Sequence, residues 1–300
     1  MSGVDSGILV AVPTYRRADQ LRAQLPVLAN QAASCCARIL VVDNDPEQSA
    51  RAVVESLSAQ YAIDYTTEVR PGVVHARNAA IHAAINAPEP VEWLAFIDDD
   101  ELPGDDWLAS LHRAALEHDA AIVTGPVDPD YAVTPERWIV ECGFFAPPRR
   151  ETGQLLTKAF TGNMMIKVAM LKTTEIRFEP RLSMSGGEDV LFSRQCAEAG
   201  ERIVWCEEAR AIEYQPAMRL TRQWIMQRAY RVGTTTSFVE LAVRPAPLSW
   251  FVILGLGCYK MLKAAVFYPL LGWMGSSHRA MYHHLWSYGR GMLRGLSTTQ

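Results

Sequence analysis

The sequence predicts an α/β fold in which a mostly parallel, Rossmann-like central sheet is flanked by helices. Short apolar runs at residues 8–12, 38–42, 63–69 and 93–97 alternate with segments whose apolar residues have helical spacing. Such alternation is typical of βαβ units, in which crossover helices join parallel strands. A chain of 300 residues with 49% hydrophobic content can also bury a large core.

The helices between these strands have recognisable starts or apolar faces. Asp19 is expected to cap a first helix in which Leu21, Leu25 and Leu28 share one face, and Pro26 is expected to bend or shorten it. Residues 128–160 lack clear periodicity and are expected to form loops over the site, as an acceptor lid. Further helices are expected around residues 53–57, 75–87, 107–111 and 183–199, and further strands at 121–124, 160–167, 203–205 and 211–214.

Polar residues follow the first, second and fourth predicted strands. They lie at residues 13–17, 43–45 and 98–100. In doubly wound sheets, ligands bind beyond the carboxyl ends of the strands, so these residues are expected to form one site. Neither the GxGxxG fingerprint nor the Walker phosphate loop is present. The sequence therefore indicates a nucleotide-compatible fold that is neither a dehydrogenase nor a P-loop ATPase.

The fourth strand runs straight into four carboxylates: Asp98, Asp99, Asp100 and Glu101. Adjacent carboxylates repel one another, and burying them unpaired is costly, so such a cluster commonly holds a cation. Mg2+ or Mn2+ suits it best, because these ions take oxygen ligands and share them with substrate phosphates. The alternative is a solvated acidic turn.

A second acidic pair, Glu188 and Asp189, follows Gly186 and Gly187 at a predicted helix start. The pair could simply stabilise the helix terminus. The glycines favour a functional interpretation, because they let the backbone approach a bulky ligand. Together the two clusters suit displacement at a carbon that bears a diphosphate: one holds a metal at the leaving group and the other deprotonates the attacking hydroxyl. A glycosidase would instead need a proton-donating acid and no metal.

The charge distribution separates a body from a tail. The net charge is −4, but no Asp or Glu follows Glu240, and the last sixty residues carry +6, which leaves −10 for the first 240. An acidic body argues against general nucleic-acid binding, whereas a basic, apolar tail fits contact with anionic lipid. The six cysteines have no paired spacing and are expected to be reduced. Residues 1–7 show no export signal, so the body is expected in the cytosol.

The tail is expected to associate with a membrane surface. Residues 248–259 and 264–277 are uncharged, but Lys260 and Lys263 separate them and Pro269 interrupts the second run. Neither run reaches the roughly 20 residues that a spanning helix needs. A monotopic or re-entrant hairpin is therefore expected, with a buried helical appendage as the alternative.

Five motifs together resemble the family 2 glycosyltransferases of GT-A fold. They lie in order at residues 12–17 (VPTYRR), 41–44 (VVDN), 76–78 (ARN), 96–101 (FIDDDE) and 186–189 (GGED). The likeness covers roughly residues 8–216 and is strongest to the bacterial exopolysaccharide subgroup that contains succinoglycan glucosyltransferases. It implies an inverting enzyme that uses a UDP-sugar with Mg2+ or Mn2+.

The resemblance also implies residue roles around the donor. Asp43 would bond the uracil edge, Arg77 would lie near the nucleotide, and Asp98 would face the ribose or sugar. An Asp43–Arg77 ion pair is the alternative for these two. The complete set implied for nucleotide-sugar binding is Pro13, Thr14, Tyr15, Arg16, Asp43, Arg77, Asp98 and Asp99.

For the chemistry, the resemblance implies that Asp100 binds the metal and diphosphate and that Asp189 is the catalytic base. Glu188 would position that base or touch the acceptor. Gly162, Asn163 and Gly187 are implied near the acceptor.

Two departures from the family pattern matter. Many relatives complete the metal site with a His near the end of the last core strand, where this chain has Ala-Ile-Glu-Tyr at 211–214. Either Glu213 substitutes or the metal relies on Asp100, diphosphate and water. Processive synthases carry Gln-x-x-Arg-Trp, whereas residues 227–232 read QRAYRV, which favours addition of a single sugar.

The sequence thus predicts a glycosyltransferase domain at residues 1–240 and a membrane-associating helical tail at 241–300. The expected reaction moves one sugar, glucose by preference, from a UDP-sugar to a lipid-linked oligosaccharide in polysaccharide biosynthesis. The expected location is the cytoplasmic face of the inner membrane, peripheral or monotopic. Two alternatives remain: a metal-dependent nucleotidyltransferase or phosphohydrolase, and a non-catalytic sugar-nucleotide-binding module.

Overall fold

The computed structural model describes residues 7–183, 185–244 and 247–297, and the chain forms two compact units. The first unit contains the described residues of 7–128, 148–183 and 188–213. The second contains those of 129–147, 185–187 and 214–297. Helix α8 (Arg222–Val243) runs unbroken past residue 240 and belongs to the second unit, so the compact units divide earlier in the chain than the predicted boundary.

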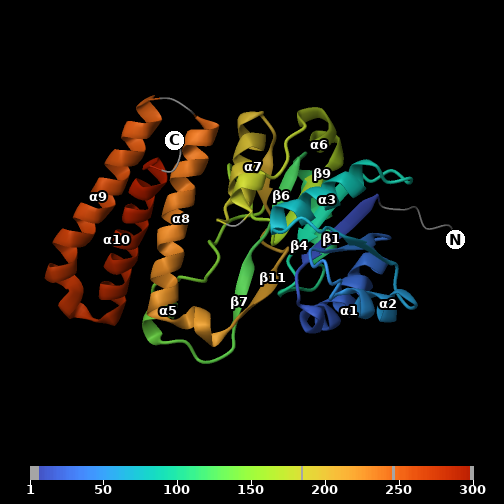
Figure 1. Ribbon diagram of the computed structural model, residues 1–300, viewed down its shortest axis with the longest axis horizontal. Helices are drawn as coiled ribbons and strands as arrows, with labels where there is room; N and C mark the ends of the chain where they lie inside the picture. Colours follow the sequence, from blue (N-terminus) through green and yellow to red (C-terminus); the bar gives the residue numbers. More distant parts are fainter. Residues whose placement is uncertain (1–6, 184, 245–246, 298–300) are drawn as a thin grey trace. The chain divides into compact units, whose positions relative to one another are not determined.

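The first unit is built on a sheet of eight strands in the order β3-β2-β1-β4-β9-β6-β10-β8. β1, β2, β3 and β4 are mutually parallel, and β9 runs antiparallel between β4 and β6 (Figure 1). The predicted α/β fold with a mostly parallel sheet is therefore confirmed. The strands are β1 (Ile8–Thr14), β2 (Arg38–Asp43), β3 (Ile63–Thr67), β4 (Trp93–Ile97), β6 (Ile122–Thr124), β8 (Leu155–Leu156), β9 (Asn163–Lys167) and β10 (Ile203–Trp205).

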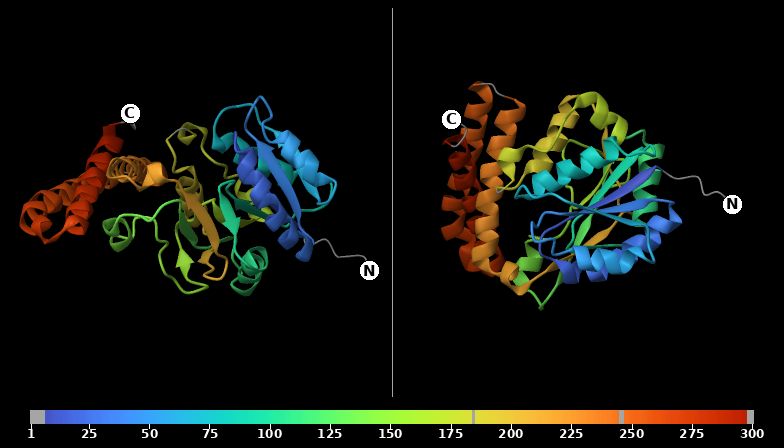
Figure 2. Two further views of the ribbon diagram at one scale, coloured as in Figure 1. Left: turned by 90° about the horizontal axis from the view of Figure 1, so that it is seen from below. Right: turned by 45° about the vertical axis from the view of Figure 1, so that its right-hand side comes forward.

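Helices cover both faces of this sheet (Figure 2). Along β1, Val10 and Val12 enter one core layer while Leu9 and Ala11 enter the other, because successive strand residues point to opposite faces. Both layers are buried, which explains the near-continuous apolar strands. The helices on one face are α1 (Ala18–Ser34), α2 (Arg51–Ser58) and α4 (Trp107–Glu117); those on the other are α3 (Val73–Ile85), α6 (Val168–Thr174) and α7 (Glu188–Glu198).

The first helix differs from its prediction at its start and in its length. Asp19 lies in the first turn of α1 rather than at its cap, which is Arg17. Pro26 does not shorten the helix, which continues for 17 residues, and a bend at Pro26 stays a prediction. The reason is burial: Leu21, Leu25 and Leu28 are fully buried against the sheet, and this packing outweighs the hydrogen bond that proline removes.

A smaller sheet has the order β5-β11-β7, with β5 (Glu101–Pro103), β11 (Ala211–Gln215) and β7 (Val127–Tyr131). β5 continues the chain directly beyond the acidic turn that follows β4. It pairs antiparallel with β11, so that Glu101 lies opposite Glu213. This pairing carries a second carboxylate to the acidic edge of the first unit.

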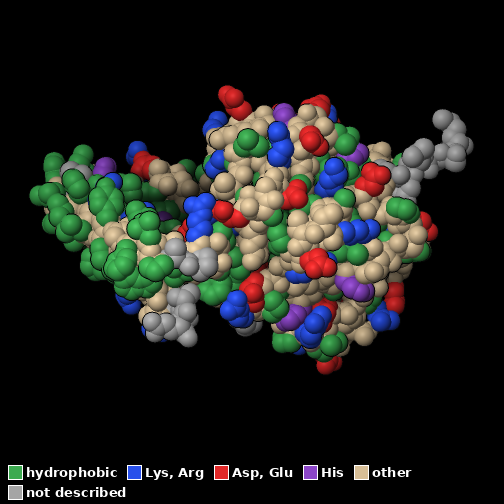
Figure 3. All heavy atoms as spheres, turned by 90° about the horizontal axis from the view of Figure 1, so that it is seen from above, with side chains coloured by type: hydrophobic (Ala, Val, Ile, Leu, Met, Phe, Trp, Pro, Cys, Tyr) green, Lys and Arg blue, Asp and Glu red, His purple; other side chains and the backbone are tan. Residues whose placement is uncertain are grey.

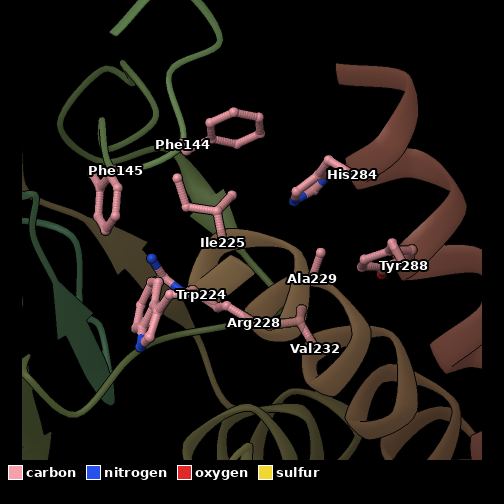
Figure 4. A pocket seen from close by; sticks show the side chains of 9 residues that line it. All are labelled: Phe144, Phe145, Trp224, Ile225, Arg228, Ala229, Val232, His284 and Tyr288. Atoms are coloured by element: carbon pink, nitrogen blue, oxygen red, sulfur yellow. The ribbon is translucent and has the colours of Figure 1, made fainter. Parts of the chain in front are cut away.

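The second unit is mainly helical. Helix α10 (Ser276–Ser297) packs against both α8 and α9 (Pro247–Leu271), and α5 (Arg137–Glu141) adjoins it. Close backbone approach requires small residues here: a Cβ on Gly233 or Gly291 would collide with the backbone of the facing helix. Aromatic rings fill the space beside α8, where Phe145 stacks on Trp224 at 5.9 Å between ring centroids (Figure 4).

Helix α9 differs from its prediction. It is one continuous helix across Lys260, Lys263 and Pro269, and its residues Pro247–Leu270 are long and apolar enough, by length and composition, to cross a membrane. Only 17% of its most apolar window is buried among the described residues, which argues against a buried appendage. Hydrophobic side chains gather on the surface of this unit in Figure 3. Those on α9 include Leu248, Phe251, Val252, Leu256, Tyr259, Leu262, Phe267 and Leu270.

Candidate active site

The polar strand ends meet at one edge of the large sheet, as predicted, because β2, β1 and β4 are neighbours. Thr14 Oγ1 donates a hydrogen bond of 2.7 Å to Asp99 Oδ2, which joins the ends of β1 and β4. Arg17 Nη1 lies 2.6 Å from Asp99 Oδ1 and 2.9 Å from Asp100 Oδ2. Thr14 and Arg17 therefore fix the positions of Asp99 and Asp100, and the alternative of a solvated acidic turn is wrong.

Arg17 is a residue whose importance the sequence analysis missed. Its guanidinium offsets two adjacent carboxylates at the point where β1 and β4 end. Burial raises the pKa of Asp99 to about 6, although Arg17 and the Thr14 hydroxyl oppose this rise. The sequence contained a signal for this contact: the basic pair Arg16-Arg17 follows β1, an acidic run follows β4, and the two strands are neighbours.

Arg77 on α3 forms the second centre of the site. Its Nη2 lies 3.0 Å from Asp98 Oδ1, and its Nη1 pairs with Glu188 Oε1 at the start of α7. The guanidinium is buried and also lies over the Phe178 ring. The alternative of an Asp43–Arg77 pair is wrong, since Arg77 instead joins the two acidic clusters, which are about ninety residues apart in the sequence.

Asp189 lies within the field of this cluster. Burial first, and then the negative charge of Glu188, raise the pKa of Asp189 to about 7, while Arg77 lowers it and Asp98 adds a smaller rise. Asp189 Oδ1 accepts a hydrogen bond of 2.7 Å from the Val190 amide. A carboxylate with such a pKa can accept a proton near neutral pH and be regenerated.

Glu101 is a further carboxylate of the site that the sequence did not assign. It is buried, and its Oε2 has no hydrogen-bond partner within the described chain. Burial, with Asp98, Glu213 and Asp100 in that order, holds its pKa well above the usual range. Gly162 lies directly against its carboxyl, where any Cβ would collide with it.

Asp43 has a structural setting at the end of β2. Its Oδ1 accepts from the Asp45 amide at 3.0 Å, and its Oδ2 accepts from the Ala50 amide at 2.8 Å and Tyr65 Oη at 2.9 Å. These bonds shape the loop between β2 and α2. The predicted contact of Asp43 with a uracil stays a prediction.

The nucleotide-side residues after β1 lie close to this loop. Arg16 Nε donates to Asp45 Oδ2 at 3.2 Å, and the Arg16 guanidinium lies over the Tyr15 ring. Tyr15 is 52% exposed, while Pro13 and Thr14 are buried in β1. An exposed aromatic ring beside a strand end is suited to stack on a base.

The residues implied near the acceptor have different surroundings. The Asn163 amide is buried: its Oδ1 accepts from Trp107 Nε1 at 2.8 Å, and its Nδ2 donates to the carbonyls of Pro126 and Ala209. Gly187, with φ of 89°, lies against Thr235 in the second unit. Their predicted places beside the acceptor, and that of Gly162, stay predictions.

The acidic edge supplies oxygen ligands only. Asp98 and Asp100 have side chains that are 34% and 16% exposed. No group of three or more His, Cys, Asp or Glu residues with metal-binding geometry occurs in the described ranges. Mg2+ and similar ions need only one or two protein carboxylates when phosphates and waters complete the shell, so these residues fit such an ion.

Taken together, these features define a GT-A-like α/β protein with an acidic sheet edge. The family model described as "Glycosyl transferase family 2" matches residues 9–174. The succinoglycan biosynthesis protein ExoM of Rhizobium meliloti (strain 1021) is 33% identical over 232 residues, which are 75% of this chain and 72% of ExoM. The chain belongs to glycosyl transferase family 2, and the resemblance seen in its motifs is confirmed.

Solved structures show the same fold. A mannosyltransferase from Pyrobaculum calidifontis, PcManGT, in complex with GDP-Man and Mn2+, gives a TM-score of 0.64 at 15% identity and covers 98% of this chain and 88% of its own. TarS 1–349 of S. aureus with UDP gives 0.54 at 16% identity over 98% and 92% of the two chains. At these identities the likeness supports the GT-A fold alone.

Replacing Arg77 tests the electrostatic design of the site. Arg77→Gln would leave Asp98, Glu188 and Asp189 without their shared cation, so we expect the free energy of unfolding at pH 8 to fall by about 3–5 kcal/mol. The loss should be smaller at pH 5, because carboxylates without a cation take up protons more readily in the folded state. Urea unfolding at both pH values measures this.

The control is Arg70→Gln, which removes an ion pair between an exposed Arg70 and Glu68 and should change stability by less than about 1 kcal/mol at both pH values. An equal loss for Arg77→Gln at pH 5 and pH 8 would contradict the account.

Proposed function

We propose that the protein is an inverting glycosyltransferase that moves one sugar from a UDP-sugar to a hydroxyl of a lipid-linked oligosaccharide. The observation that carries this proposal is the convergence of two acidic clusters on Arg77. One cluster lies at the sheet edge, where GT-A proteins bind nucleotide sugars, and the other contains a carboxylate with a pKa of about 7.

In this proposal Asp189 removes the proton from the acceptor hydroxyl as its oxygen attacks the anomeric carbon. The bond from that carbon to the diphosphate breaks on the opposite side, which inverts the configuration. Glu188 maintains the raised pKa of Asp189 through its negative charge, while its pairing with Arg77 fixes its position. Asp98 holds the other side of the same guanidinium and faces the sugar or ribose.

Asp100 would hold a divalent ion, with Asp98 as the neighbouring carboxylate. Bound Mg2+ or Mn2+ would neutralise charge on the leaving diphosphate. PcManGT, whose structure contains Mn2+, supports the use of such an ion. Arg17 pairs with Asp99 and Asp100. Its positive charge would also attract the diphosphate when the nucleotide sugar binds.

The pathway and location follow from the relative and from the helical unit. ExoM is named for succinoglycan biosynthesis, which supports a role in exopolysaccharide biosynthesis, with glucose as the proposed sugar. The exposed apolar surface of α9 supports association with the membrane, on the cytoplasmic face of the inner membrane. A lipid-linked acceptor would be presented at that surface.

The base is tested by Asp189→Asn. The amide cannot take up the proton, so we expect sugar transfer to fall by about 10²–10⁴-fold while UDP binding is retained. Transfer is measured as radiolabel moving from UDP-glucose into lipid extracts, and binding by calorimetry. Asp64→Asn on an exposed part of β3 is the matched control and should leave transfer unchanged. Full turnover in Asp189→Asn would refute the assignment.

The metal ligand is tested by binding rather than by activity. We expect Mn2+ to strengthen UDP binding to the native protein and Asp100→Asn to reduce that gain at least about tenfold, because a carboxylate ligand is lost. Asp105→Asn, which changes an exposed carboxylate just beyond β5, should keep the full gain. A Mn2+ effect of equal size in both variants would exclude Asp100 as the ligand.

A further inference from the structure

The second unit contains an open groove between α8 and α10 with a volume of about 920 Å³. Its lining combines three arginines and other hydrogen-bonding side chains with Trp224, Met226 and Tyr230, and no Asp or Glu belongs to it among the described residues. The polar residues that matter here are Arg222, Gln227, Arg231, His283, Ser287 and Arg290. A groove with three guanidinium groups and no carboxylate is suited to an anion that carries phosphate.

Two of the arginines are held in place by aromatic rings. Arg222 lies over the Trp138 ring with Cζ 5.4 Å from the centroid, and Arg290 lies over the Tyr230 ring at the same distance. Arg231 is exposed at the groove. Stacking orients a guanidinium, which is always charged, while its edge stays available to donate hydrogen bonds. The groove is therefore organised before any ligand arrives.

His283 lines the groove beside Arg222. Its pKa is lowered by burial first and then by the charge of Arg222. Arg228, on another side of α8, differs from these residues, because its guanidinium lies over the Phe145 and Trp224 rings in a pocket of about 110 Å³ (Figure 4). The large cationic space is thus on the side of α8 that carries Arg231.

An apolar pocket of about 360 Å³ adjoins this groove. It lies between α9 and α10, and His283 lines both spaces. Tyr268, Pro269 and Trp286 form much of its wall. A cationic groove that shares a residue with an aromatic, apolar pocket matches a molecule with a phosphate at one end and a hydrocarbon chain at the other.

We propose that this paired site binds an anionic membrane phospholipid, with its phosphate in the α8–α10 groove and an acyl chain in the α9–α10 pocket. The proposal rests on the membrane association proposed above. Two observations select the phospholipid: the charge complementarity of the groove, and the continuity of the pocket with the exposed apolar surface of α9. A nucleic acid would have no use for the apolar pocket.

The test measures binding of the full-length protein to vesicles by co-sedimentation. We expect binding to phosphatidylcholine vesicles that contain 30% phosphatidylglycerol to exceed binding to pure phosphatidylcholine, as an order-of-magnitude choice of anionic content. Arg231→Gln with Arg290→Gln should weaken binding to the anionic vesicles at least about tenfold, since each cation at an anionic surface contributes about 1 kcal/mol and these two also contact the phosphate directly.

The matched control is Lys263→Gln with Arg294→Gln, which removes two exposed charges from α9 and α10 outside the groove. We expect it to weaken binding clearly less than the groove variant does, since it removes the same number of charges but leaves the direct contacts of the groove with the phosphate intact. Equal losses in the two double variants would overturn the site, because they would show diffuse charge attraction alone. Stronger binding of a polyprenyl phosphate than of phosphatidylglycerol would overturn the phospholipid as occupant.

UDP binding, measured on the same preparations, separates the two proposals. Normal UDP binding in the groove variant, with weakened vesicle binding, would support the lipid site independently of catalysis. The protein could also bind no UDP and still lose vesicle binding in the groove variant alone. That result would remove the proposed transferase activity and keep the lipid site.

Discussion

The buried cation Arg77 is the interaction on which the site depends. Three carboxylates, Asp98, Glu188 and Asp189, come from two elements distant in sequence, and a cluster of this charge would be strongly unfavourable away from water without a partner. α3 supplies that partner from between the sheet edge and α7. The fold therefore gains its acidic edge only together with the guanidinium that balances it.

This balance also sets the chemistry. Full neutralisation would leave Asp189 a weak base, whereas no neutralisation would keep it protonated at neutral pH. Arg77 pairs directly with Asp98 and Glu188, and it lowers the pKa of Asp189 by less than burial and Glu188 together raise it. Arg17 plays a similar part beside the proposed metal ligand. Its positive charge offsets the repulsion between the adjacent carboxylates of Asp99 and Asp100. Arginines thus balance both acidic clusters, while Glu101 has no arginine among the causes of its raised pKa.

The sequence predicted the sheet and the convergence of its polar ends, because apolar runs and helical spacing are local signals of strands and helices. It did not predict that α1 would keep its length through Pro26, which the burial of its leucines explains. It also did not predict that α9 would continue through two lysines, although lysine is a good helix former. It also missed the roles of Arg17 and Glu101. Their partners come from strands that are neighbours in space only: β1 and β4 end beside each other at Arg17, and β5 pairs with the distant β11 at Glu101.

The most direct test of this electrostatic account is the pH dependence of sugar transfer in the native protein and in Glu188→Gln. The account predicts an acid limb near pH 7 in the native protein, since transfer requires deprotonated Asp189. In Glu188→Gln the limb should move to lower pH, because a negative charge that raises this pKa is gone and Arg77 is left with fewer partners. An acid limb at the same pH in both proteins would contradict the account.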